Sequence, residues 1–230
     1  MQPAFCDLIP PTNMKTKLFI KSELNLAGFI LMLSAILILI TIFFEHRIGW
    51  IGVKRPPEEV PYFILDSWGD LKTIWGWQVI GFSLSAVSYI LFLKHATHIW
   101  KSLLWAILVL CTISIVIAFG TTLGSYGPAL EVYETQPELF LSVRGAVRSL
   151  YTPGLLGLLL LTIIYLMETF GANGSINRKW GLIGFSVILL GIVLSFVPSL
   201  PGKTIGAVIF FVPLLVGYAY WRQTENIIKN

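Results

Sequence analysis

Long apolar runs alternate with polar segments along the chain and predict six membrane-spanning helices. The runs cover residues 24–44, 74–93, 102–123, 154–170, 180–197 and 204–221. A helix needs about 20 predominantly apolar residues to cross the hydrocarbon core, where it satisfies its own backbone hydrogen bonds. The fourth and fifth runs are short, but the segment before the fourth is itself helix-like. The pattern predicts an all-α polytopic transmembrane helical bundle.

The connections divide the chain into one membrane domain and two tails. We expect residues 1–23 to form a cytoplasmic tail, residues 24–221 the six-helix transmembrane domain and residues 222–230 a second tail. The stretch "MKTKLFIK" from Met14 resembles a bacterial start, so residues 1–13 are expected to be a disordered or misassigned extension. The connections at 45–73 and 124–153 are each about 30 residues long, and the other three are short.

Lysine and arginine set the expected orientation. Nine of them fall in segments on the side of the N-terminus and seven on the opposite side. Cytoplasmic segments carry the excess of these residues, and the acidic residues of the two long connections offset the cations there. The sequence therefore predicts that both termini are cytoplasmic and that both long connections lie outside, in a multi-pass protein of the bacterial inner membrane.

The composition excludes several classes of protein. Mean hydropathy is +0.79 and 12% of residues are charged, against about 25% in soluble domains. The net charge of +4 is spread without a long basic cluster, so no nucleic-acid partner is expected. Membrane lipids, and a membrane protein partner, are the partners that fit. Tryptophans near span ends are expected to be interfacial anchors, namely Trp75, Trp77, Trp100, Trp180 and Trp221.

Two pairs of charged residues form the candidate polar site. Asp66 and Asp70 are four residues apart before the second span, and Arg144 and Arg148 are four apart before the fourth. If each segment is helical, each pair lies on one face. Apolar residues at helical spacing flank both pairs, so we expect the segments to fold back and bring the pairs together. Three interpretations stay open: a clasp, a site for an anionic ligand such as a lipid headgroup, or plain solvation.

Other ionisable residues give little chemistry. Glu168 is the only acid inside a predicted span, and a local ion pair with Arg178 or Lys179 accounts for it. Glu168→Gln is therefore expected to change stability only slightly. His95 and His98 would share one helix face at the end of the second span, without further ligands. No metal, cofactor or catalytic residue is predicted, and no proton relay can be drawn through the spans.

Small residues and one proline predict how the spans pack. Gly81, Ser85 and Ser88 fall on one side of the second span, as Gly184, Gly191 and Ser195 do on the fifth. Such faces allow close helix approach. Pro213 is expected to bend the last span, since proline removes an intrahelical hydrogen bond.

The C-terminal half resembles a known group of proteins. The stretch "INRKWGLIGFSVILLGIVLSF", residues 176–196, followed by "FFVPLLVGYAYW", residues 210–221, is similar to the end of a bacterial family of six- to seven-helix integral membrane proteins that has no established activity. Over about 50 residues, both share a basic-tryptophan turn, a glycine-spaced span and a last span with a proline. The resemblance implies a helical membrane fold and no particular reaction.

Three function classes follow from these features. The favoured one is a non-enzymatic membrane protein, either an accessory subunit or a lipid- or amphiphile-binding bundle. The first alternative is a small transporter that is not coupled to protons, because the middles of the spans carry no ionisable residue. The second is a membrane-embedded enzyme that works at the outer leaflet through Asp66, Asp70, Arg144 and Arg148.

Overall fold

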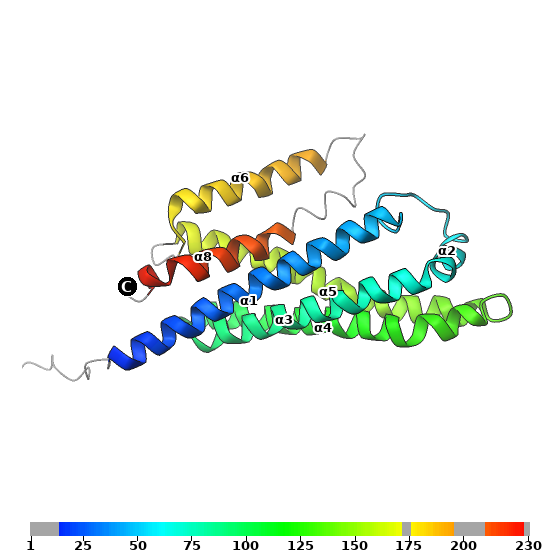
Figure 1. Ribbon diagram of the computed structural model, residues 1–230, viewed down its shortest axis with the longest axis horizontal. Helices are drawn as coiled ribbons and strands as arrows, with labels where there is room; N and C mark the ends of the chain where they lie inside the picture. Colours follow the sequence, from blue (N-terminus) through cyan, green and yellow to red (C-terminus); the bar gives the residue numbers. More distant parts are fainter. Residues whose placement is uncertain (1–13, 172–175, 196–209, 228–230) are drawn as a thin grey trace, which may run out of the picture.

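The computed structural model describes residues 14–171, 176–195 and 210–227, and every regular element in these ranges is a helix (Figure 1). The helices are α1 (Met14–Arg47), α2 (Val60–Asp66), α3 (Trp68–Lys94), α4 (Ile99–Glu131), α5 (Pro137–Phe170), α6 (Arg178–Ser195) and α8 (Phe211–Ile227). The predicted all-α fold is confirmed. Residues 1–13 lie outside the described ranges.

Four helices are long and apolar enough to cross a membrane, judged by length and composition over the described residues. They include Phe19–Arg47 of α1 and all of α3, α4 and α5. The 18 residues of α6 and the 17 of α8 rise only about 26 to 27 Å, slightly less than a hydrocarbon core. The predicted fifth and sixth spans include residues 196–209, which are not among the described residues.

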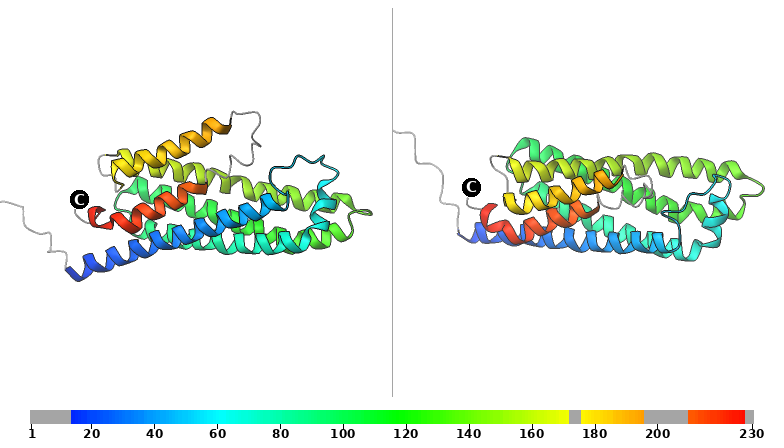
Figure 2. Two further views of the ribbon diagram at one scale, coloured as in Figure 1. Left: turned by 45° about the horizontal axis from the view of Figure 1, so that its top comes forward. Right: turned by 90° about the horizontal axis from the view of Figure 1, so that it is seen from above.

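Five helices form a closed ring. Around it, α1 packs on α3, α3 on α4, α4 on α5, α5 on α8, and α8 back on α1. Helix α6 lies outside this ring against α5 and α8 (Figures 1 and 2). The start of α1 and the end of α8 lie at one end of the bundle, which we call the terminal end. Helix α2 and the turn between α4 and α5 lie at the other, which we call the hairpin end.

Helices α1, α3, α4 and α5 are longer than the apolar runs predicted. Helix α1 begins at Met14, so residues 14–23 are helical rather than part of a tail. Helices α4 and α5 have 33 and 34 residues, and only residues 132–136 connect them. The expectation of a connection of about 30 residues at 124–153 is therefore wrong. Helices α4 and α5 continue past the predicted spans because their inward faces bury Tyr126, Leu130 and Phe140 against each other and α3.

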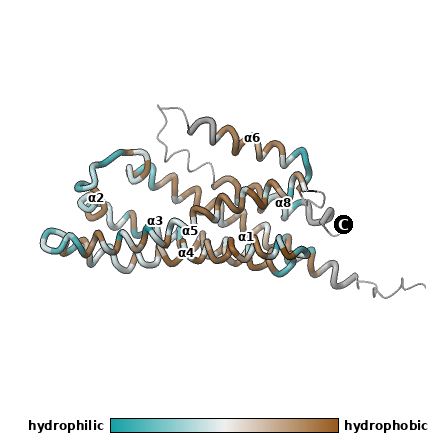
Figure 3. The backbone as a smooth tube through the Cα atoms, turned by 180° about the vertical axis from the view of Figure 1, so that it is seen from behind, coloured by the Kyte–Doolittle hydropathy of each residue, from teal (hydrophilic) through white to brown (hydrophobic). Residues whose placement is uncertain are grey.

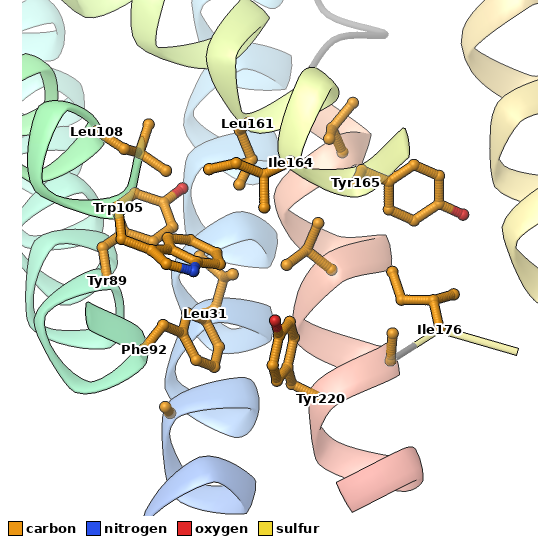
Figure 4. Packing of buried hydrophobic residues seen from close by; sticks show 14 of the residues in the cluster. Leu31, Tyr89, Phe92, Trp105, Leu108, Leu161, Ile164, Tyr165, Ile176 and Tyr220 are labelled. Atoms are coloured by element: carbon orange, nitrogen blue, oxygen red, sulfur yellow. The ribbon is translucent and has the colours of Figure 1, made fainter. Parts of the chain in front are cut away.

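The core has two main parts, one toward each end of the bundle. Toward the terminal end, Tyr89, Phe92, Trp105 and Tyr220 meet with the leucines and isoleucines of α1, α4 and α5 (Figure 4). The rings of Phe92 and Tyr220 are 4.3 Å apart between centroids. At the hairpin end, Ile64, Leu71, Trp75, Tyr126 and Phe140 form what we call the hairpin cluster, along with Ile74, Ala129 and Leu130. Figure 3 shows polar residues gathered beside it in the connections.

Small residues bring α1 against its two neighbours, which confirms the packing role expected for Gly81, Ser85 and Ser88. All three are buried. The Ser34 hydroxyl donates to the carbonyl of Gly81 at 2.8 Å, and Ser88 donates to the carbonyl of Ala27 at 2.7 Å. On the other side of α1, the backbones of Gly28 and Gly217 touch. Helix approach this close requires glycine or serine at the crossing.

Pro213 lies in the first turn of α8. The expected bend of the last span stays a prediction, because residues 204–209 of that span are outside the described residues. The first N–H groups of a helix have no intrahelical acceptor, and proline loses nothing there. Gly184 packs closely on Tyr165 of α5, as a small-residue face predicts, since an added Cβ would overlap the phenol. The surroundings of Gly191 and of the Ser195 side chain are not described by the structure.

Candidate functional site

An open groove runs along the surface between α1 and α3 toward the hairpin end. Its volume is about 600 Å³, and one wall comes from Leu37, Ile40, Thr41, Phe44 and Arg47 of α1, followed by Ile48. The other wall comes from Asp70, Thr73, Ile74 and Trp77 of α3. Both sets recur at three- and four-residue spacing, which places each on a single helix face.

The interior of the groove is apolar in practice, although two threonines line it. The Thr41 hydroxyl donates to the carbonyl of Ile38 at 2.7 Å, and the Thr73 hydroxyl donates to the carbonyl of Gly69 at 3.0 Å. Each threonine therefore offers no free hydroxyl donor to the groove, because its donor is used within its own helix. Buried Thr41 and Ile74 form the floor, and exposed Ile40, Phe44 and Trp77 form the rims.

Two opposite charges stand at the end of this groove nearest the hairpin end. Arg47 is the last residue of α1 and Asp70 lies in the first turn of α3, and both side chains are exposed. Within the described part of the chain, no ion pair joins Arg47 and Asp70 or either one to another residue. The groove thus offers one guanidinium and one carboxylate at the edge of an apolar channel.

The other predicted site residues lie elsewhere at the hairpin end. Asp66 is the exposed last residue of α2, Arg144 is half-buried on α5 and Arg148 is exposed one turn further. No hydrogen bond or ion pair among the described residues joins the aspartates to the arginines, so the clasp we expected is not formed. The apolar half of the expectation is confirmed, because Val143 and Val147 of α5 pack on the hairpin cluster that holds Ile64 of α2.

The hairpin end contains a buried carboxylate that the sequence did not predict. Glu45 is 5% exposed, and its Oε1 accepts a hydrogen bond from the Trp75 indole N–H at 2.8 Å. The sequence placed Glu45 in a connection, because the apolar run ends at Phe44. The structure continues α1 through Arg47, and one more turn points Glu45 inward toward α3.

The turn after α1 folds back on the backbone of Glu45. The backbone carbonyl of Glu45 accepts from the N–H of Trp50 at 2.9 Å, and Gly49 and Gly52 have φ of 80° and 92°. These left-handed positions favour glycine. The turn places the Trp50 ring 5.7 Å from that of Trp75. Two glycines within four residues, just after an acid at a helix end, were the sequence signal for this arrangement.

Beside Trp75, the next turn of α3 carries a second buried polar group. Gln78 is buried, and its Oε1 has no hydrogen-bond partner within the described residues. A buried acceptor without a partner is rare in native proteins. Gln78 of α3 and Glu45 of α1 come from different helices, and the structure shows them as two separate buried polar groups.

The terminal end carries ion pairs that hold neighbouring helices together. Lys101 of α4 lies 2.8 Å from Glu168 of α5, and Glu168 is 1% exposed. The expected pairing of Glu168 with Arg178 or Lys179 is therefore corrected. Glu168 pairs with Lys101 of α4, because α4 packs against α5. Such a pair cannot be read from chain proximity, because its members are 67 positions apart.

The histidine expectation is also corrected. Helix α3 ends at Lys94, so His95 and His98 cap two different helices and share no helix face. Glu23 of α1 accepts from Lys94 at 2.8 Å and lies 2.5 Å from His95. In the part of the chain that the structure describes, no three His, Cys, Asp or Glu side chains gather closely enough to hold a metal ion.

The tryptophans expected at the membrane interface divide into two kinds. Trp77, Trp100, Trp180 and Trp221 are all exposed, as an interfacial anchor must be. Trp75 is 3% exposed, and its N–H bonds Glu45 instead of the headgroup layer. The anchor role expected for Trp75 is therefore wrong, because its side chain packs inside the hairpin cluster.

No protein-family model matches the chain, and searches of curated proteins and of solved structures gave no match either. The resemblance of residues 176–221 to a bacterial membrane family stays a prediction.

Proposed function

We propose that this protein is a non-enzymatic helical membrane protein that binds a membrane amphiphile, such as a lipid, in the groove between α1 and α3. The observation that carries the proposal is the groove itself. It is about 600 Å³ in volume, within the range of ligand sites. Its walls are apolar along their length and charged only at one end, which is the polarity of a single-chain or two-chain lipid.

The place of the groove along the helices supports the same proposal. Leu37, Ile40 and Phe44 belong to the apolar run of α1, and Arg47 follows that run within one turn. An acyl chain would lie beside hydrocarbon-depth residues, and its headgroup would reach the charges at the hairpin end. Burial of apolar surface then supplies the binding free energy, at roughly 25 cal/mol for each Å².

The proposal includes an orientation and a number of spans. We place the terminal end in the cytoplasm of a bacterial inner membrane, with α6 and α8 as the fifth and sixth spans. The groove then serves the outer leaflet. Cysteines introduced at positions 58 and 134 are expected to react with an impermeant reagent added outside, while one at position 173 is not. The opposite labelling pattern would reverse the orientation.

The groove is tested by filling it. Ile40→Trp adds a large ring to one wall, and the matched control Ile36→Trp adds the same ring to an exposed position of α1 that does not line the groove. The purified proteins are compared by native mass spectrometry after extraction in a mild detergent. The expected result is co-purified lipid on wild type and on the control, and its loss from Ile40→Trp. Equal lipid on all three proteins would refute the proposal.

A small transporter is a second candidate, supported by two buried carboxylates. Glu45 lies near the hairpin end and Glu168 near the terminal end, and both are at most 5% exposed. Buried ionisable groups in spans commonly mark ion or substrate paths. Substrate-dependent flux across proteoliposomes, lost in Glu45→Gln, would favour this candidate. The enzyme alternative required the aspartate and arginine pairs to act together, and no described contact joins them.

A further inference from the structure

The two charges at one end of the groove limit which lipid headgroups can bind there. Arg47 and Asp70 come from opposite walls, on α1 and α3, and both line the same groove. We infer that the groove selects a phospholipid whose headgroup has a primary ammonium beside its phosphodiester, as in phosphatidylethanolamine. This inference rests on the proposed function, since it names the class of lipid that the groove holds.

Each half of this zwitterionic headgroup has one complementary partner. The Arg47 guanidinium is a planar donor fork that suits phosphate oxygens. The Asp70 carboxylate accepts hydrogen bonds and suits an ammonium with N–H donors. Neither charge is engaged by another described residue through an ion pair. Both are therefore available to a ligand without first breaking a contact.

The remaining polar groups of the groove do not compete for the headgroup. The hydroxyls of Thr41 and Thr73 are bonded to carbonyls of their own helices. The exposed indole of Trp77 lies on the same wall as Asp70, one helical turn beyond Thr73. Its amphipathic ring suits the level at which acyl chains meet headgroups. The charged residues that line the groove, Arg47 and Asp70, thus stand at a single end and carry one charge of each sign.

Other common headgroups satisfy only part of this end. An anionic headgroup such as glycerol phosphate pairs with Arg47 but carries no cation for Asp70, whose negative charge then opposes it. A choline headgroup has the cation but no N–H, so it cannot donate to the Asp70 carboxylate. The primary ammonium does both. One charge-assisted hydrogen bond at an exposed site corresponds to a preference of about three- to fivefold.

The test is a competition among lipids that differ only in the headgroup. The full-length protein is delipidated in detergent and offered equal amounts of dioleoyl phosphatidylethanolamine, phosphatidylcholine and phosphatidylglycerol, and bound lipid is counted by native mass spectrometry. Phosphatidylethanolamine is expected to lead both others by about three- to fivefold. Asp70→Asn is expected to abolish that lead, while Arg47→Gln lowers the binding of all three lipids.

Asp66→Asn is the matched control, because Asp66 is an exposed aspartate four residues away that does not line the groove. It should keep the full preference. A large excess of soluble phosphoethanolamine should not displace the lipid, since the apolar walls supply most of the binding; displacement would overturn the assignment to a lipid.

The outcomes separate this inference from the proposed function. If no lipid binds, or if Ile40→Trp binds as much as Ile36→Trp, the groove is not an amphiphile site and both ideas fail. If lipid binds and Ile40→Trp blocks it, but all three headgroups bind equally, only the headgroup inference fails. The same holds if Asp70→Asn and Asp66→Asn have identical effects on the preference.

Discussion

The crossing of α1 and α8 gives the sharpest test of the packing. It requires that Gly28 and Gly217 each carry a hydrogen atom where other residues carry a Cβ. A Cβ added to Gly28 would lie 2.6 Å from the carbonyl oxygen of Gly217 and 2.6 Å from the backbone N of Trp221. A Cβ added to Gly217 would lie 2.8 Å from the carbonyl oxygen of Gly28. The obstacles are backbone atoms, which no side-chain rotation can move. Gly28→Ala therefore requires α1 and α8 to separate.

The size of the effect follows from the separation. An ordinary contact needs about 3.4 Å, so the helices must part locally by roughly 0.8 Å. A gap of 0.5 to 1 Å already forfeits about a quarter to a half of the dispersion attraction between facing atoms. Overpacking of this kind costs about 1 to 3 kcal/mol. Alanine is favoured over glycine in a helix by up to about 1 kcal/mol, so we expect a net loss of about 1 to 2 kcal/mol.

Thermal unfolding in detergent, followed by tryptophan fluorescence, measures this loss. For a chain of this size, 1 kcal/mol corresponds to about 2 to 4 °C in Tm, so Gly28→Ala should lower Tm by about 2 to 8 °C. The matched control is Gly120→Ala on α4, where an added Cβ meets nothing within 4 Å and Tm should stay the same or rise. Adding Gly217→Ala to Gly28→Ala should cost less than the two single losses combined, because the helices have already parted. Equal Tm values for Gly28→Ala and Gly120→Ala would refute the close crossing.

Two further expectations concern the buried carboxylates. Glu168→Gln should destabilise the bundle by about 1.5 to 3 kcal/mol, the size of a hydrogen bond to a charged group, because it removes the charge that faces Lys101. This replaces the slight effect expected from the sequence, since Glu168 is buried. Glu134→Gln, at an exposed glutamate of the α4–α5 turn, should shift Tm by about 2 °C at most, on the ±0.5 kcal/mol scale of surface changes, and equal shifts would contradict the buried pair. Trp75→Phe should cost a similar 1.5 to 3 kcal/mol by removing the donor to Glu45, whereas Trp77→Phe, which alters an exposed ring, should cost far less; the reverse order in chemical unfolding would show that Trp75 is not the buried one.

The apolar runs located six of the seven described helices but not their ends, and α2 lies inside the predicted connection at 45–73. Each run identified a helix because a membrane span must be both apolar and helical. The segment at 124–153 was read as a connection because its composition is more polar than the spans. In the structure it is helical, since Tyr126 and Phe140 bury their rings against each other at 5.3 Å between centroids. Packing partners of this kind come from another helix and leave no signal in local hydropathy.

The charged residues show the same division. Sequence spacing correctly put Asp70 at a helix start beside the apolar runs, and it marked the region as unusual. The sequence predicted that Asp70 meets Arg144 and Arg148. That prediction used only the four-residue spacing within each segment, which does not tell which helices are neighbours. The structure instead places Asp70 on one groove with Arg47, which belongs to the neighbouring helix in the ring.

What the sequence determined by itself was therefore the class of the fold, the identity of its long helices and the small-residue faces that pack, because these follow from hydropathy and side-chain size along one helix. What only the tertiary structure decided was which charges are buried and which meet. Glu45 and Glu168 are buried and Asp66 is exposed, although all three are ordinary acids near the ends of apolar runs. The rotation of each helix about its axis makes that difference. That rotation is set by contacts such as Ser34 with Gly81 and Gly28 with Gly217, which join helices far apart in the chain.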